Sequence, residues 1–164
     1  MLNIDEVNGL ERHEFTNTFA RLFEHSPWIA ARTAGKRPFA NRAEFFAALQ
    51  DTVMKARDDE KLCLIRAHPD LVGNATLTRE STQEQAAAGL GNLSADEVAQ
   101  FQRFNTDYKE RFGFPFVICA RENKKEAILS AFPRRLNNSR PAEIEAALRE
   151  IFKIADLRLK DLVK

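Results

Sequence analysis

Histidine is scarce in this chain, and one of its three histidines lies at a break in helix-forming sequence. His68 follows the apolar run 62–65 and precedes Pro69, which drives the residue before it out of helical geometry. We therefore expect His68 near the end of a helix, where the dipole favours a protonated ring that can exchange protons. A structural role, bonding the last helical carbonyl groups, explains the position equally well. His13 and His25 lie among polar residues and are predicted to be exposed.

A second candidate is the stretch 80–90, with the sequence ESTQEQAAAGL. Four of its residues are spaced three, one and three positions apart and would share one helix face: Ser81, Glu84, Gln85 and Ala88. A hydroxyl, a carboxylate and an amide on a helix otherwise rich in alanine suit close approach to a small polar ligand. The competing interpretation is a capping box, in which Ser81 and Glu84 only satisfy backbone donors.

A third candidate is Arg158, on the apolar side of a predicted C-terminal helix. At about 100° per residue, it falls within about 80° of the residues of an apolar stripe. That stripe consists of Ile144, Leu148, Ile151, Ala155 and Leu162. A guanidinium in such a seam costs several kcal/mol unless it meets an anion or several acceptors. A ligand is one explanation; a buried Asp or Glu partner and snorkelling to the surface are the others.

Other kinds of site find no support in the sequence. Cys-x-x-Cys, His-Glu-x-x-His, the glycine-rich nucleotide loops and Gly-x-Ser-x-Gly are all absent. The net charge is +1, which gives no argument for nucleic-acid binding. Catalysis would therefore rely on His, Glu, Arg and backbone groups, and neither a metal nor a cofactor is expected.

The cysteines and the termini favour the cytoplasm. Cys63 and Cys119 both lie in apolar runs and are predicted to be free thiols packed in the core. The first residues carry no basic and apolar signal, and no run of about 18 apolar residues exists. The last three residues, Leu-Val-Lys, are not a peroxisomal address.

Helical periodicity predicts the elements that must position these residues. We expect helices over about 12–24 and 42–56, one ending near His68, one running from the capping box at 94–97 to Gly113, and one over about 141–163. The apolar run 114–120 has no helical period and is predicted to be extended and buried. One such run cannot form a sheet. The predicted fold is all-α: one compact domain, 1–164, of about eight helices with one short extended segment.

Four segments together resemble the OHCU decarboxylases, which act on 2-oxo-4-hydroxy-4-carboxy-5-ureidoimidazoline (OHCU) late in the route from urate to allantoin. The segments are 64–73 (LIRAHPDLVG), 80–90, 112–121 (FGFPFVICAR) and 153–159 (KIADLRL). The resemblance runs from about Phe15 to the C-terminus. Each motif alone is weak, but four in the right order are highly specific.

The resemblance implies an all-helical, cofactor-free and usually dimeric enzyme that converts OHCU to (S)-allantoin. It implies His68 as the catalytic proton donor, with Glu84 beside it. The residues that it implies for the substrate site are Pro69, Ser81, Thr82, Gln83, Glu84, Gln85, Phe116, Val117, Ile118, Cys119, Ala120 and Arg158. This chain departs from many relatives in a shorter stretch between Asp70 and Ser81, and it lacks the peroxisomal tripeptide of some eukaryotic members.

Two other functions stay open at this point. One is a helical interaction module that kept the fold but not the activity, although such a module has no need for His68, Ser81, Glu84, Gln85 and Arg158 together. The other is a hydrolase of a related ureide, in which the same His and Glu activate water. Release of carbon dioxide distinguishes the decarboxylase from the hydrolase.

Overall fold

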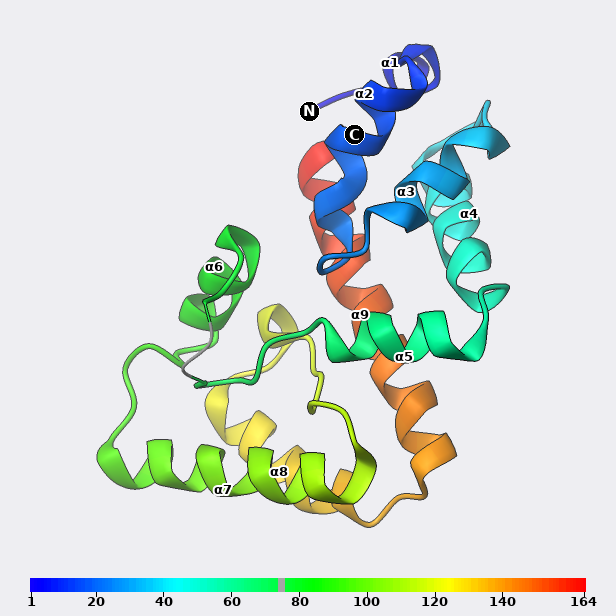
Figure 1. The fold of residues 1–164 in the computed structure, drawn as a ribbon. Coiled ribbons are helices and arrows are strands. Elements are labelled where there is room, and N and C mark those ends of the chain that lie inside the picture. Colours follow the sequence, from blue (N-terminus) through cyan, green and yellow to red (C-terminus); the bar gives the residue numbers. More distant parts are fainter. Residues whose placement is uncertain (74–75) are drawn as a thin grey trace. The chain divides into compact units, whose positions relative to one another are not determined.

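The computed structural model of this chain describes residues 1–73 and 76–164, and helices dominate them (Figure 1). These residues form nine α-helices and three short 3-10 helices, and their only β-type pairing is an isolated bridge between Leu2 and Val163. The predicted all-α class is confirmed. The chain falls into two compact units, Met1–Ala67 with Phe152–Lys164 and His68–Ile151, here called the first and the second unit.

The first unit is built around a cluster of phenylalanine rings. Its helices are α1 (Ile4–Gly9), α2 (Arg12–Phe19), α3 (Pro27–Thr33), α4 (Arg42–Met54) and α5 (Asp58–Arg66), with the 3-10 helices η1 (Ala20–Leu22) and η2 (Ala34–Lys36). Phe15, Phe19 and Phe45 pack with ring centroids 4.8–5.3 Å apart. The helix predicted over 12–24 begins as expected, but its last part is the 3-10 turn η1.

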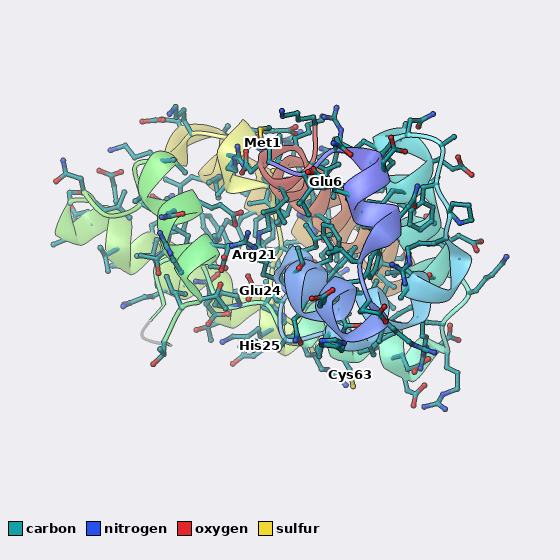
Figure 2. The ribbon with its side chains drawn as sticks, turned by 90° about the horizontal axis from the view of Figure 1, so that it is seen from above. Met1, Glu6, Arg21, Glu24, His25 and Cys63 are labelled. Atoms are coloured by element: carbon teal, nitrogen blue, oxygen red, sulfur yellow. The ribbon has the colours of Figure 1, made fainter. Side chains whose placement is uncertain are left out.

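Helix α5 ends where the proline predicted. Its last residue is Arg66, and the C-cap Ala67 donates its N–H to the Cys63 carbonyl at 3.0 Å. The side chain of Cys63 is exposed on this helix (Figure 2). The prediction that both cysteines lie in the core is therefore wrong for Cys63, because the buried positions of this turn are taken by Leu64 and Ile65. Cys119 is buried, as predicted.

The second unit contains α6 (Arg79–Ala87), α7 (Ala95–Phe112), the 3-10 helix η3 (Ala120–Glu122), α8 (Lys125–Leu136) and the first part of α9 (Arg140–Leu162). Helix α7 starts at a capping box of Ser94 and Glu97 and stops at Gly113, which has the left-handed φ of 78°. Both ends match the prediction. Helix α9 continues from the second unit into the first, and Leu148, Ile151 and Ala155 of its predicted apolar stripe are buried, whereas Ile144 and Leu162 are half-buried.

The segment between α7 and η3 is extended, as its lack of helical period predicted. Residues 115–119 have neither helix nor strand, and the rings of Phe116 and Phe132 stack with centroids 3.8 Å apart. In the described ranges, no helix is long and apolar enough to cross a membrane.

Candidate active site

His68 is the first residue of the second unit and is 9% exposed. It lies one position beyond the helix C-cap, at the start of a tight turn. His13 and His25 are exposed, as predicted (Figure 2 shows His25). Val72, in the same turn, has a φ of 56°, a left-handed conformation that costs a non-glycine residue on the order of 1 kcal/mol. The turn that carries His68 therefore needs support from its surroundings.

Gln85 of α6 provides part of that support. Its Oε1 accepts the N–H of Val72 at 3.3 Å, and its Nε2 lies 3.5 Å from the carbonyl oxygen of Asp70. Gln85 was predicted as a substrate ligand from its motif. These bonds connect the second motif, on α6, to the turn after His68, so the structure brings the two strongest sequence signals together.

Helix α6 presents the face that the spacing predicted. Ser81 and Ala88 are buried and Glu84 and Gln85 are half-buried, whereas Thr82 lies on the exposed side. The capping interpretation of Ser81 is wrong, because the N-cap is Thr78, whose Oγ1 accepts the Ser81 N–H at 3.2 Å. Ser81 is thus inside the helix and Glu84 lies too far along it to cap its start.

A small hollow of about 120 Å³ lies beside this helix. Its lining consists of Glu80, Gln83, Glu84, Ala87 and Arg121. The hollow is larger than a single water molecule needs, so one polar group of a ligand can enter it. Gln83 and Glu84 were predicted for the site. Glu80 and Arg121 were not, although both stand at the ends of quoted motifs, which is the signal that could have found them.

The side chains of the extended segment contribute mainly to packing. Phe116, Val117, Cys119 and Ala120 are buried, and only Ile118 is half-buried. The Phe116 ring is 1% exposed, with the guanidinium of Arg135 4.3 Å above it. This segment thus offers a ligand its backbone more than its side chains.

Several backbone groups of this segment already bind protein side chains. The carbonyl of Val117 accepts from Arg135 at 2.5 Å. The N–H of Cys119 donates to Glu150 at 2.9 Å, and its carbonyl accepts from Asn123 at 2.9 Å. These three bonds show that the protein's own side chains hold part of the segment extended.

The Cys119 thiol is not activated. Burial raises its pKa to about 11, with the nearby carboxylate of Glu122 adding to the effect. At neutral pH the sulfur therefore stays protonated and is a poor nucleophile.

Glu143 of α9 joins this segment to the core of the second unit. Its carboxylate is fully buried and accepts from Tyr108 at 2.5 Å, from Arg135 at 2.8 Å and from Asn138 at 3.0 Å. Burial and the hydrogen bond to this carboxylate raise the pKa of Tyr108 far above its ordinary value of 10.0. The same Arg135 holds the Val117 carbonyl, so Glu143 fixes the extended segment indirectly.

Arg158 belongs to the first unit, whereas the other predicted site residues belong to the second. It is 6% exposed and donates to Glu24 at 2.8 Å and to the Arg21 carbonyl at 3.1 Å. Figure 2 labels Arg21 and Glu24, which lie in and just after η1. Of the explanations for a buried arginine, the carboxylate partner is observed and snorkelling is wrong.

The functional groups available for chemistry at the site are therefore an imidazole, a carboxylate, a hydroxyl and amides. Within the described residues, no group of three or more His, Cys, Asp and Glu side chains is arranged to hold a metal ion.

Known proteins are similar to this chain over most of its length. The family model for OHCU decarboxylase matches residues 8–160. The chain belongs to the OHCU decarboxylase family. A 2-oxo-4-hydroxy-4-carboxy-5-ureidoimidazoline decarboxylase of Haloferax volcanii is 41% identical over 160 residues, covering 98% of this chain and 95% of that protein. The corresponding protein of Amia calva is 41% identical over 167 residues, covering 99% of this chain and 95% of its own length.

Two solved structures of this family's fold are also similar. An (S)-allantoin synthase superposes with a TM-score of 0.82 at 25% identity, covering 99% of this chain and 54% of that one. An OHCU decarboxylase crystallised in the presence of (S)-allantoin gives a TM-score of 0.73 at 25% identity, covering 93% of this chain and 98% of that one. Family membership thus extends over nearly the whole chain.

Proposed function

We propose that this protein is a carboxy-lyase that converts OHCU to (S)-allantoin in urate degradation, without a cofactor. The observation that carries the proposal is the pair of hydrogen bonds that Gln85 makes with the turn after His68, accepting from Val72 and donating to Asp70. They hold a helix bearing Ser81 and Glu84 against the turn that begins with the candidate proton donor. Membership of the OHCU decarboxylase family over residues 8–160 supports the same function.

The substrate supplies the electron sink that decarboxylation needs. The carbon that loses carbon dioxide also bears a hydroxyl and adjoins a ring C=N group. When the C–C bond to the carboxylate breaks, its electron pair forms a C=C bond, and the imine nitrogen takes up the displaced pair and a proton. The hydroxyl then becomes a carbonyl as it loses its proton, and the neighbouring ureido-bearing carbon gains one. Pyridoxal phosphate or thiamine would therefore duplicate a function of the substrate.

We assign the proton transfer of this reaction to His68. Its ring is nearly buried, so a proton exchanged there is delivered from one direction, which produces a single enantiomer. We assign Glu84 a supporting electrostatic role beside it. Pro69, the residue after His68, and Ser81, buried on α6, are proposed to contact the substrate, and Thr82, Gln83 and Gln85 complete the proposed α6 contribution.

Arg158 is proposed to bind the carbonyl or ureido end of OHCU. A tight clamp on the leaving carboxylate would stabilise the ground state and slow the reaction. Negative charge instead grows on the ring as the imine accepts electrons, and a guanidinium there stabilises the transition state. Backbone groups of Phe116, Val117, Ile118, Cys119 and Ala120 that the protein does not already bind are proposed for the remaining amides.

The test generates OHCU in place with urate oxidase and hydroxyisourate hydrolase and follows (S)-allantoin by circular dichroism. We expect His68→Ala and Glu84→Ala to lower kcat/KM by about 10²–10⁴-fold. His13→Ala and Glu110→Ala, both at exposed positions, are the matched controls and should keep the wild-type rate. Wild-type rates in both site variants would refute the mechanism, and ammonia in place of carbon dioxide would indicate a hydrolase.

We further propose that the protein is a homodimer, as the family resemblance implies, and that it works in the cytoplasm, as the cysteines and termini predicted. Light scattering after size-exclusion chromatography measures the mass directly. A particle of twice the 18.7 kDa chain mass is expected, and a monomer that is fully active would contradict the proposal.

A further inference from the structure

The turn that begins at His68 is unusually tight. Val72 adopts a left-handed φ of 56°, and a Cβ added at Gly73 would lie 2.9 Å from the Cβ of Asp70. Left-handed backbone at a β-branched residue is a conformation that the surroundings must impose. Gln85 imposes part of it, as described above, and the rest comes from a helix that the substrate-site prediction did not include.

Helix α7 holds the same turn through two residues one helical turn apart. Asn105 donates from Nδ2 to the carbonyl of Leu71 at 2.7 Å. Lys109 forms an ion pair with Asp70 at 2.6 Å between Nζ and Oδ2. The first bond is buried and short, and the second is half-exposed, so Asn105 is the stronger restraint.

Asn105 is an unfavourable choice for stability alone. Its side chain is 5% exposed, and its Oδ1 is buried without a hydrogen-bond partner in the described part of the chain. A buried acceptor without a partner destabilises the fold, and a leucine of similar size would remove that acceptor, although it would leave the Leu71 carbonyl without its donor. What leucine cannot do is donate a hydrogen bond to Leu71.

We propose that Asn105 is a positioning residue for His68. Its bond to the Leu71 carbonyl, assisted by the Lys109–Asp70 pair, holds the strained turn in the conformation that orients the imidazole. The inference rests on the proposed role of His68 toward OHCU. It assigns to α7 a part in the reaction without contact to substrate.

The test is Asn105→Leu in the full-length protein, with kcat, KM, Tm and the His68 ring signals in NMR as readouts. We expect kcat to fall about ten- to a hundredfold and KM to change less than about threefold. Tm should change little, because the loss of the unpartnered Oδ1 offsets the loss of the bond to Leu71. The His68 ring signals, identified by their loss in His68→Ala, should shift, while those of His13 and His25 stay in place.

The matched control is Phe101→Leu, a buried change one turn earlier on the same helix. It should lower Tm but leave kcat and the His68 signals unchanged, which is the pattern of a purely structural residue. If Asn105→Leu shows that same pattern, or keeps the wild-type kcat with unmoved His68 signals, the inference is wrong. If Asn105→Leu does not fold, Lys109→Met replaces it as the test, with an expected two- to fivefold loss of kcat and a shift of the His68 signals. If Lys109→Met keeps the wild-type kcat and leaves the His68 signals in place, the inference is wrong.

The outcome can be separated from that of the proposed function. If the wild-type protein forms no (S)-allantoin, the proposed function fails, and the positioning inference is then judged by NMR alone. A shifted His68 signal in Asn105→Leu supports it, and an unmoved signal overturns it.

Discussion

Two buried arginine–glutamate pairs, one in each unit, have nearly the same geometry. Arg158–Glu24 in the first unit and Arg135–Glu143 in the second both have N–O distances of 2.8 Å. The side chains of Arg158 and Glu24 are 6% and 1% exposed, and those of Arg135 and Glu143 are 13% and 0% exposed. Arg135 holds a core carboxylate and the backbone of the extended segment, which is a structural role. The geometry of a buried pair therefore does not by itself identify a substrate ligand, and the proposed role of Arg158 rests on family membership.

The largest expected effect is a loss of protein stability when the Arg135–Glu143 pair is broken. Glu143→Ala would leave Arg135 buried without its carboxylate and remove the acceptor of Tyr108 and Asn138. We expect the free energy of unfolding to fall by about 3–5 kcal/mol, measured by urea denaturation. The double variant Arg135→Met/Glu143→Leu, which removes both charges, should recover much of that loss. A loss below about 1 kcal/mol in the single variant would contradict the assigned structural role.

The next effect separates the two pairs by activity. Arg158→Lys keeps a positive charge for Glu24 but loses the planar fork of the guanidinium. If Arg158 binds OHCU, kcat/KM should fall about ten- to a hundredfold, or about 1.4–2.7 kcal/mol of transition-state stabilisation. Arg135→Lys makes the same change in the other pair and should lose less than about threefold. Equal losses in both variants would remove the distinction between the pairs.

A smaller effect is the pH dependence of stability caused by Tyr108, which donates a hydrogen bond to Glu143 of the second pair. The folded-state pKa of Tyr108 is raised above 10.0, so its neutral phenol contributes fully to stability below that pH, and the contribution is lost as pH rises toward the folded pKa. The free energy of unfolding should fall by about 1.4 kcal/mol per pH unit in that range because of this group. Tyr108→Phe should remove this part of the slope.

The same residue gives a direct spectroscopic check. Tyr108 is the only tyrosine, so the ultraviolet absorbance of tyrosinate reports it alone. The folded protein should show no tyrosinate at about pH 11, and the unfolded protein should show it. Tyrosinate in the folded protein near pH 10 would contradict both the burial of Tyr108 and its hydrogen bond to Glu143.

The smallest effect compares the two cysteines, one in each unit. Cys63 is exposed, whereas Cys119 is buried and has a pKa of about 11. A disulfide reagent at pH 8 should therefore modify one thiol quickly and the second only slowly or on unfolding. Cys63→Ser, the control, should abolish the fast phase. Two fast thiols in the wild-type protein would contradict the burial of Cys119.

Local signals explain which helices were predictable. Helix α7 has its capping box at Ser94 and Glu97 and its left-handed Gly113 within its own sequence, so both ends could be placed without tertiary information. The unpredicted helices α1, α3 and α8 are different. They are short or weakly marked, and α8 has no side-chain cap and contains Pro133. Short helices depend on packing for their stability, and packing is not visible in a local pattern.

The capping prediction for α6 shows the limit of local rules. Thr78 and Ser81 are both acceptable N-caps, and sequence alone offered Ser81 with Glu84 as a standard box. The structure uses Thr78, which moves Ser81 into the helix where it is buried. Burial of one face decided between two residues of nearly equal capping propensity.

The sequence by itself determined the fold class, the end of α5 before His68, the polar face of α6 and the extended segment, because each follows from spacing, proline geometry or a missing helical period. Only the tertiary structure decided that Glu24 is the anion for Arg158, that side chains already bind part of the 117–119 backbone, and that Asn105 holds the His68 turn. The bonds of Arg158 to Glu24, of Cys119 to Glu150 and of Asn105 to Leu71 join residues 31 to 134 positions apart, and a hydrogen bond at that separation exists only once the chain has folded.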